Sequence, residues 1–328
     1  MTFMDLPDLA SRTLGGATVV CNDESFCAAA NLIKPGRPAF TPQHFDERGQ
    51  IYDGWETRRR REPGSDWVIV RLGAPGVPHG VVIDTAYFTG NFPEHASIEA
   101  AWVDGPLETA VWREILPRSP LKGDTANAFA IADPHRFTHV RLTIHPDGGV
   151  ARLRVHGEAV LDPTFASVLP LDLAALGNGG CAIDCSDEFY SAPNNLLLPG
   201  QARVTGEGWE TRRRRDSGND WVRLRLATLG VPRVAELDTM PFKFNASGAA
   251  MLTGVTAEGD EVELLPRTEL RPDEVHRFLL PGTLPAVDHV RMDVYPDGGM
   301  GRLRLYGTPS ASGLDRLAER WLATSSRA

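Results

Sequence analysis

Residues 54–91 read GWETRRRREPGSDWVIVRLGAPGVPHGVVIDTAYFTGN, and residues 208–245 read GWETRRRRDSGNDWVRLRLATLGVPRVAELDTMPFKFN. The two segments are identical at 21 of 38 positions. Three further pairs of blocks match in the same order, namely 21–36 with 185–200, 116–121 with 265–270, and 146–157 with 296–307. Self-similarity over such a length indicates a duplicated domain and not a short solenoid repeat.

The duplication divides the 328 residues into two predicted domains, in keeping with the ~150 residues of a typical domain. We place the first copy at about residues 17–160 and the second at 181–308, with residues 161–180 as a connector. The tail, residues 309–328, is predicted to be helical because apolar residues recur there at helical spacing: Leu314, Leu317, Trp321 and Leu322.

Each copy has the sequence pattern of a β protein. WVIVRLG (67–73) and GVVIDTAYF (80–88) read as strands on either side of a Gly-Val-Pro turn signal. FTHVRLTIHPDGGVARLRVHG (137–157) reads as two strands joined by an Asp-Gly hairpin turn. With 32 glycines, 25 prolines and no long helical pattern, the sequence predicts an all-β fold of two tandem jelly-roll antiparallel β-sandwich domains.

The composition excludes several classes of protein. A net charge of −9 disfavours a general nucleic-acid binder, and no stretch reaches the ~18 apolar residues of a membrane span. The N-terminus lacks the pattern of a signal peptide and the C-terminus is not a peroxisomal address, so we expect a cytoplasmic protein. The cysteines lack zinc-site spacing and are expected to be free thiols: Cys21, Cys27, Cys181 and Cys185.

Runs of four arginines, at residues 58–61 and 212–215, are the most prominent local feature of each copy. Strand geometry would place Arg58 and Arg60 on one face and the other two arginines on the opposite face. A basic run is most often a solvated face or a polyanion patch. Here, however, aromatic and acidic residues flank each run, and such arginines commonly pair with carboxylates or bind a small anion. Both interpretations stay open.

Four carboxylates recur in both copies: Glu56/Glu210, Asp66/Asp220, Asp84/Asp238 and Asp147/Asp297. Asp147 is expected to stabilise the Pro-Asp-Gly-Gly turn through local hydrogen bonds. Asp84 ends an apolar strand, where it would either pair with an arginine or act in catalysis. Glu56 stands beside the arginine run, and the sequence does not separate a salt-bridge role from a general acid or base role.

His145 and His156 flank the expected hairpin, but tyrosines replace both in the second copy. A base or metal ligand at these positions would therefore exist in one copy only. The motifs of zinc proteases, α/β-hydrolases and nucleotide-binding loops are absent from the sequence. The sequence thus requires no cofactor, while a divalent metal held by dispersed residues stays open.

Several motifs together resemble the allantoicase family: DESFCAAANL (23–32), FDERGQIYDGWE (45–56), the arginine run with Gly-x-Asp-Trp, and IDTAYFTGN (83–91). The resemblance covers essentially the whole chain, including its two-copy organisation. It implies two jelly rolls of the galactose-binding type and a homo-oligomeric hydrolase acting on a non-peptide C–N bond. The implied reaction converts allantoate to ureidoglycolate and urea in purine (allantoin) degradation.

Allantoate is a small carboxylate whose central carbon carries two ureido groups. A site for it needs a cation for the carboxylate, acceptors for ureido N–H groups, and groups that move protons. We therefore expect catalytic roles for Glu56, His145 and Asp84, and substrate-binding roles for Arg58, Arg60, Thr85, Asn91 and Arg152. Their counterparts in the second copy are Glu210, Arg212, Asp238 and Asn245.

The second copy departs from the family pattern, which has a segment like H-F-K-G-N. Here the segment reads Pro241-Phe242-Lys243-Phe244-Asn245, so Phe244 stands where glycine is usual. We expect this loop to be rearranged, which favours the first copy as the site. The alternative function is a non-enzymatic tandem that binds a small ligand, or an inactive relative of the enzymes. Release of urea from allantoate distinguishes these alternatives.

Overall fold

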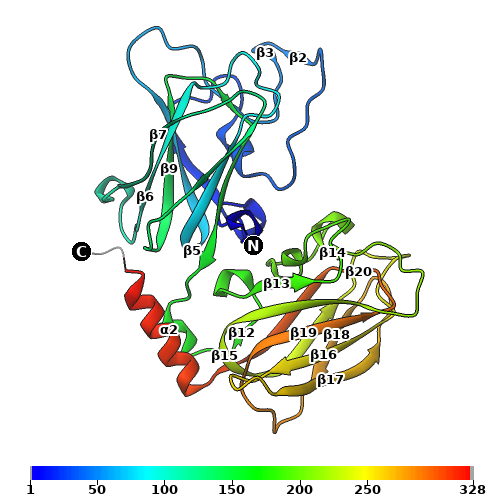
Figure 1. Ribbon diagram of the computed structural model, residues 1–328. Coiled ribbons are helices and arrows are strands. Elements are labelled where there is room, and N and C mark those ends of the chain that lie inside the picture. The colour runs from blue at the N-terminus through cyan, green and yellow to red at the C-terminus, as the bar shows by residue number, and fades with distance from the viewer. Residues whose placement is uncertain (1, 326–328) are drawn as a thin grey trace. The chain divides into compact units, whose positions relative to one another are not determined.

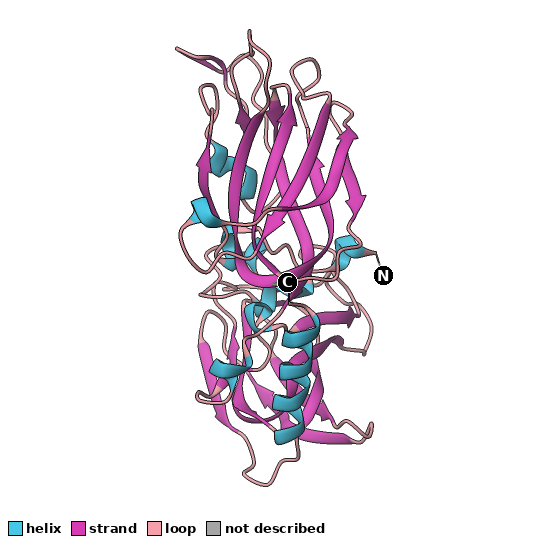
Figure 2. Ribbon diagram, turned by 90° about the vertical axis from the view of Figure 1, so that its left-hand side faces the viewer, coloured by secondary structure: helices cyan, strands magenta, loops and turns pink. Residues whose placement is uncertain are grey.

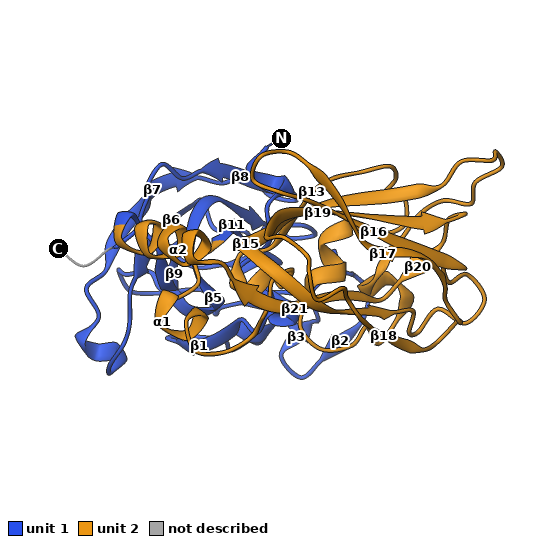
Figure 3. Ribbon diagram, turned by 90° about the horizontal axis from the view of Figure 1, so that it is seen from below, with its two compact units in different colours: residues 1–158, 323–328 blue, residues 159–322 orange. Residues whose placement is uncertain are grey.

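The computed structural model describes residues 2–325, which form two compact units (Figure 3). The first contains the chain as far as Glu158 together with the residues from Ala323 onward, and the second contains Ala159–Leu322. Strands dominate both units, and α2 (Ala311–Ala323) is the longest helix described (Figure 2). The expectation of an all-β fold is confirmed.

The first unit is built around one antiparallel sheet in the order β1-β5-β9-β6-β7, with β8 and β11 pairing to β5. Short 3-10 helices occupy Phe3–Asp5, Arg12–Leu14, Ala29–Ile33 and Leu107–Thr109. The strands are β1 (Ala17–Cys21), β2 (Phe45–Asp46), β3 (Gly49–Gln50), β4 (Trp55–Glu56), β5 (Asp66–Asp84), β6 (His95–Ala101), β7 (Arg113–Pro120), β8 (Ala126–Ala130), β9 (Phe137–His145), β10 (Gly149–Val150) and β11 (Arg152–Ala159).

Strand β5 belongs to both layers of the sandwich. Its first half pairs with β1 and β9, and after a register shift between Arg71 and Gly76 its second half pairs with β8 and β11. A strand that bends and changes partners in this way connects two packed sheets. The Gly-Val-Pro sequence at 76–78 lies inside β5. The expectation of a turn there is wrong, because the chain bends without reversing direction.

The expectation of a hairpin at Pro-Asp-Gly-Gly is also wrong. Strand β9 pairs with β5 and β6, whereas β11 pairs with the other half of β5, so the two strands belong to different layers. The glycines therefore lie in a crossing between layers, where β10 pairs with β4. A Cβ added to Gly149 would lie 2.0 Å from the ring of buried Phe88, so packing, and not turn geometry, requires glycine here.

The second unit repeats this architecture (Figure 1). The long strand β15 again pairs with β13 and β19 through Arg225, and with β21 from Gly230 onward. The strands are β12 (Leu171–Asp172), β13 (Cys181–Cys185), β14 (Trp209–Glu210), β15 (Asp220–Asp238), β16 (Ala249–Val255), β17 (Glu261–Glu269), β18 (Val275–Leu279), β19 (Val287–Tyr295), β20 (Gly299–Met300) and β21 (Arg302–Pro309). Two tandem antiparallel β-sandwiches are thus confirmed.

Residues 161–180, expected to form a connector, lie within the second unit. They contain α1 (Pro163–Ala166) and β12, which pairs with β21. Further 3-10 helices occupy Leu176–Asn178, Pro193–Leu197 and Thr205–Glu207. In the tail, α2 buries Leu317 but leaves Leu322 75% exposed, so the predicted apolar face is incomplete. Residues 326–328 of the predicted helical tail lie outside the described residues.

Each unit fixes its functional loops on a buried tryptophan. Trp55 and Trp209 are 0% exposed, and their indole N–H groups donate to the carbonyls of Asp23 and Asp187, at 2.8 and 2.9 Å. Because the tryptophan starts β4 or β14, the residues that follow it are held at the surface next to the loop that contains the aspartate. The arginine runs follow directly and lie in loops, so the expectation that they form strands is wrong.

Candidate active site

Glu56 and Asn91 form the first cluster of the candidate site. The amide Nδ2 of Asn91 donates to Oε1 of Glu56 over 2.7 Å. Both residues are fixed through Gly149, which pairs with Glu56 across β4 and β10 and whose N–H donates to the Asn91 carbonyl over 2.7 Å. Two residues that are 35 positions apart are thus brought together, as the sequence predicted for one site.

Residues 37–53 form a loop that is longer than the equivalent chain of the second copy. This inserted loop lies beside Glu56. Its Tyr52 stacks on Phe88 with ring centroids 4.6 Å apart, and Phe40 stacks on Tyr52 at 5.2 Å. Burial, with a smaller contribution from the Glu56 charge, raises the pKa of the Tyr52 hydroxyl. The loop therefore places aromatic rings next to the carboxyl of Glu56.

The carboxyl of Glu56 is half-buried and makes no ion pair among residues 2–325. Burial raises its pKa above that of an ordinary glutamate, while the hydrogen bond from Asn91 acts in the opposite direction. Of the two roles that the sequence left open, the structure does not support pairing with the arginine run. A carboxylate with a raised pKa is a stronger base than a solvated one.

The arginine run lines a pocket of about 360 Å³ in the first unit. The pocket is bordered only by polar and charged residues: Asn22, Asp23, Arg58, Arg59, Arg60, Arg61, Glu62 and Asp66. Neither Glu56 nor Asn91 lines this pocket, but Arg58, which does, follows Glu56 by two residues in the chain.

Alternate arginines of the run are neutralised. Arg58 pairs with Asp23 at 3.0 Å, and Arg60 pairs at 2.6 Å with Asp66, which is 1% exposed. Asp147 accepts the backbone N–H of Arg60 over 2.7 Å, so its carboxylate anchors this loop instead of the turn expected from the sequence. Within the described chain Arg59 and Arg61 are exposed and form no ion pair. The guanidinium groups that remain for a ligand are therefore not those predicted.

Asp66 also has an unused acceptor. Its Oδ1 accepts hydrogen bonds from Arg60 and from the Asn22 amide at 3.0 Å, but its buried Oδ2 has no partner within residues 2–325. An unsatisfied buried carboxylate oxygen costs stability unless a ligand or water supplies a donor. Exposed cations and a carboxylate with an unsatisfied buried oxygen thus line the same pocket.

The second unit reproduces these contacts residue by residue. Asn245 donates to Glu210, Arg212 pairs with Asp187 at 2.7 Å, and Arg214 pairs with buried Asp220 at 2.6 Å. The substitution at Phe244 does not rearrange the loop, because the Gly299 N–H still donates to the Asn245 carbonyl over 2.7 Å. The equivalent residue of the first unit, Gly90, shows why a side chain is tolerated at this position. A Cβ added to Gly90 would meet nothing within 4 Å. The expected rearrangement is therefore not seen at the Asn245 end of the loop.

The remaining predicted residues lie apart from the Glu56–Asn91 pair or are committed elsewhere. Thr85 is 0% exposed and donates to the Lys122 carbonyl over 2.6 Å. Asp84 caps the following turn by accepting the Ala86 N–H over 2.9 Å, and Asp238 accepts the Met240 N–H in the same way over 2.8 Å. Burial raises the pKa of Asp238.

Arg152 is 2% exposed and donates to the backbone carbonyl and the carboxylate of Asp53, at 2.7 and 2.5 Å. Asp53 is the last residue of the inserted loop. Arg152 thus holds one end of that loop, and its counterpart Arg302 donates to the Glu207 carbonyl over 2.7 Å.

His145 is held between two serines. Its Nδ1 lies 2.8 Å from the Ser65 hydroxyl and its Nε2 lies 3.1 Å from the Ser97 hydroxyl. Burial lowers its pKa, and the charges of Arg118 and His95 lower it further. The ring is therefore neutral near pH 7, with both nitrogens engaged.

Two pairs of aspartates were not identified from the sequence. One pair binds the arginine runs, and the other accepts backbone N–H groups of a strand. Asp23 and Asp187, the partners of Arg58 and Arg212, lie in the matching blocks at 21–36 and 185–200, which could have marked them. Asp8 and Asp172 each accept backbone N–H groups of β11 or β21, at 2.9 and 3.0 Å. Both are followed by Leu-Ala, which places the start of the duplication upstream of residue 17.

No group of three or more His, Cys, Asp or Glu is placed to hold a metal ion in the part of the chain that the structure describes. The four cysteines are free, and burial raises the pKa of Cys21 and of Cys185 to about 11. No helix in residues 2–325 is long and apolar enough to cross a membrane.

Comparison with known proteins agrees with the duplication. A family model described as the allantoicase repeat matches residues 7–160 and again residues 171–310. A probable allantoicase of Nocardia farcinica is 55% identical over 312 residues, covering 93% of this chain and 95% of the relative. One of Streptomyces coelicolor is 45% identical over 339 residues, covering 98% and 90%.

The crystal structure of allantoicase from Saccharomyces cerevisiae shares 34% identity, covers 92% of each chain, and superposes with a TM-score of 0.80. Fold and site define a duplicated β-sandwich protein that repeats one arrangement of arginines, aspartates and a Glu–Asn pair in each copy. The chain belongs to the allantoicase family, as the sequence predicted.

Proposed function

We propose that this protein is a hydrolase that converts allantoate and water to ureidoglycolate and urea, a step of purine breakdown. The proposal rests on the Glu56–Asn91 pair and the arginine-lined pocket, both in the first unit of a chain of the allantoicase family. The fold alone would not carry it, because β-sandwiches serve many functions.

The pocket has the chemistry that allantoate requires. Arg59 and Arg61 supply the unpaired positive charge for the carboxylate, since guanidinium presents a fork that matches it. Asp66 also lines the pocket, and its carboxylate is the acceptor there for a ureido N–H. Arg58 and Arg60, predicted as the carboxylate ligands, are better suited to fixing the loop through their own aspartates.

Glu56 moves the proton. Its carboxylate takes a proton from the attacking water as oxygen bonds to the central carbon. Because the central carbon is tetrahedral, its C–N bond breaks in the same step, and the departing ureido nitrogen takes up the proton, so that neutral urea leaves and the carboxylate is restored. The inserted loop favours this step because limited exposure to water makes the carboxylate more basic.

The direct test is the release of urea and ureidoglycolate from allantoate by the purified protein, with and without chelator and added divalent metal. Turnover is expected. Absence of turnover by the folded protein under every metal condition would favour the non-enzymatic binding function. Turnover that chelator abolishes and metal restores would add a metal to the site.

The role of the arginines has its own test. Replacing Arg59 and Arg61 by Gln should raise the KM for allantoate by about tenfold or more, because an ion-paired hydrogen bond is lost. If Arg58→Ala and Arg60→Ala raise the KM while the Arg59 and Arg61 variants do not, the carboxylate binds to the arginines first predicted. Cytoplasmic location and a homo-oligomeric state remain proposals from the sequence.

A further inference from the structure

The second unit retains the ligand-binding groups of the first. Asp220 is 1% exposed, its Oδ1 accepts hydrogen bonds from Arg214 and the Ser186 hydroxyl, and its buried Oδ2 has no partner within residues 2–325. This is the same unsatisfied oxygen as in Asp66. An atom left without a donor in both copies of a duplicated unit indicates an acceptor kept for a ligand or water.

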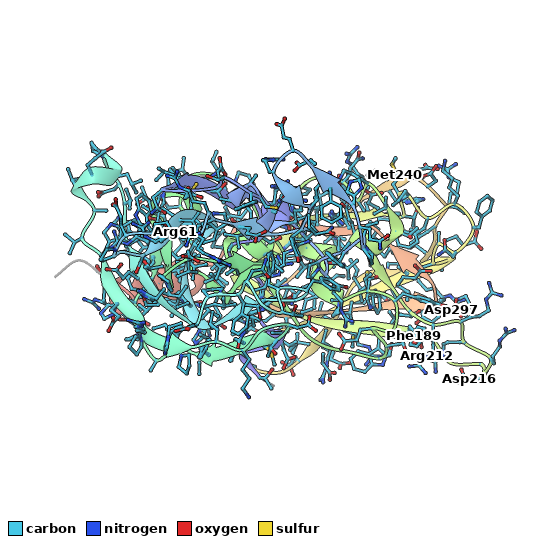
Figure 4. All side chains as sticks on the ribbon, turned by 90° about the horizontal axis from the view of Figure 1, so that it is seen from above. Arg61, Phe189, Arg212, Asp216, Met240 and Asp297 are labelled. Carbon is cyan, nitrogen blue, oxygen red and sulfur yellow. The ribbon has the colours of Figure 1, made fainter. Side chains whose placement is uncertain are left out.

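The free cations are also retained. Arg212 and Arg214 are neutralised by Asp187 and Asp220, whereas Arg213 and Arg215 are exposed and form no ion pair in the described chain. The Arg214 N–H donates to Asp297 over 2.5 Å, so the loop is anchored as in the first unit. Figure 4 shows Phe189, Arg212 and Asp297 gathered at one end of this unit.

What the second unit lacks is the inserted loop. In the first unit the Asn31 amide donates to the Gly54 carbonyl across 23 residues, and in the second Asn195 donates to Gly208 across 13, each over 2.9 Å. The two hydrogen bonds are equivalent, but the chain that they enclose is shorter in the second unit than in the first. Exposed aromatic rings stand in the second unit instead, with Phe189 at 63% and Phe244 at 98% exposure.

We propose that the second unit holds a second, open binding site for a small carboxylate that carries ureido N–H groups, formed by Arg213, Arg215 and Asp220, and that it binds this ligand without hydrolysing it. Retained cations and a retained acceptor provide binding. The second unit lacks the inserted loop that places Tyr52 beside Glu56, so the neighbouring Glu210 lacks that part of the proposed catalytic site. The choice of ligand rests on the proposed function.

The test counts ligands bound per chain. The probe is N-carbamoylglycine, a carboxylate with one ureido group and no second ureido group to expel. Equilibrium dialysis against the full chain should give two molecules bound per chain. The double variant R213Q/R215Q and the matched variant R59Q/R61Q should each reduce the number to one, and their combination should abolish binding. All four arginines are exposed, so the variants are expected to fold.

The second site would be overturned if the chain bound one molecule of N-carbamoylglycine and lost it only in R59Q/R61Q. It would also be overturned if R213Q/R215Q left the number of bound molecules unchanged. Allantoate turnover is measured on the same samples. Turnover with one bound ligand means that the proposed function stands and the second site fails. Two bound ligands without turnover means that the second site stands and the proposed function fails.

Discussion

At the residue scale, one hydrogen bond tunes the proposed base. The Asn91 amide donates to Glu56 and favours the ionised carboxylate, while burial raises the pKa. Activity should therefore fall as pH decreases through a pKa that lies above that of an ordinary glutamate, because protonation removes the base.

Replacing Asn91 by Ala removes the donor that lowers the pKa. The acidic limb of the kcat/KM profile should then move to higher pH. The matched variant Asn245→Ala, in the second unit, should leave this limb where it is. An acidic limb that stays in place in Asn91→Ala would show that Glu56 does not produce it.

Arg152 contributes to the stability of the fold through its ion pair with Asp53. The hydrogen bond from Arg152 and that from Lys34 hold the pKa of Asp53 at about 2, although burial acts in the opposite direction. Because the folded-state pKa is depressed, the pair stabilises the fold above the ordinary pKa of about 3.8, and this contribution is lost as pH falls towards 2.

Breaking this pair by Arg152→Ala should cost about 3 kcal/mol at pH 7, since it leaves a partly buried carboxylate without its main partner. Denaturant unfolding of the full chain measures this difference. Lys34→Ala, which removes the more exposed partner, should cost less than about 1 kcal/mol. Equal costs for the two variants would argue against Arg152 as the main anchor of the loop.

At the element scale, the inserted loop separates the two units in function. Replacing residues 32–53 by residues 196–207 would connect the equivalent anchors with the shorter chain of the second unit. The fold should survive, because Asn31 keeps the Gly54 carbonyl. Exposure of Glu56 should lower its pKa, so the acidic limb should move to lower pH and kcat should fall by about tenfold or more. A chimera with unchanged kcat and pH profile would show that the loop does not act on Glu56.

The strands show what local sequence signals can and cannot predict. Alternation and turn residues identify most strand segments, but they also predict turns at Gly-Val-Pro and at Pro-Asp-Gly-Gly, where the chain does not reverse into a hairpin. Gly149 is glycine because Phe88, 61 positions away in the chain, lies against it, and no local pattern contains that contact. The bend of β5 likewise depends on which strands pair with each of its halves.

At the scale of the whole molecule, the duplication was visible in the sequence and fixed the fold class and the family. The candidate site was predicted in part. Glu56 and Asn91 recur in both copies and do meet, but which arginines are free depends on Asp23 and Asp66, whose positions follow from the tertiary fold. Thr85 and Arg152 also recur, because a duplicated fold repeats its structural contacts together with its site.

The duplication supplies the most direct test of the central claim, that hydrolysis depends on Glu56 of the first unit. Glu56→Gln and Glu210→Gln change the same atom at equivalent positions of the two units, and allantoate turnover is measured for both in the full chain. Glu56→Gln should lower kcat by about 100-fold or more, as expected for loss of a general base, and Glu210→Gln should lower it far less. Equal losses in the two variants, or a larger loss in Glu210→Gln, would contradict the account.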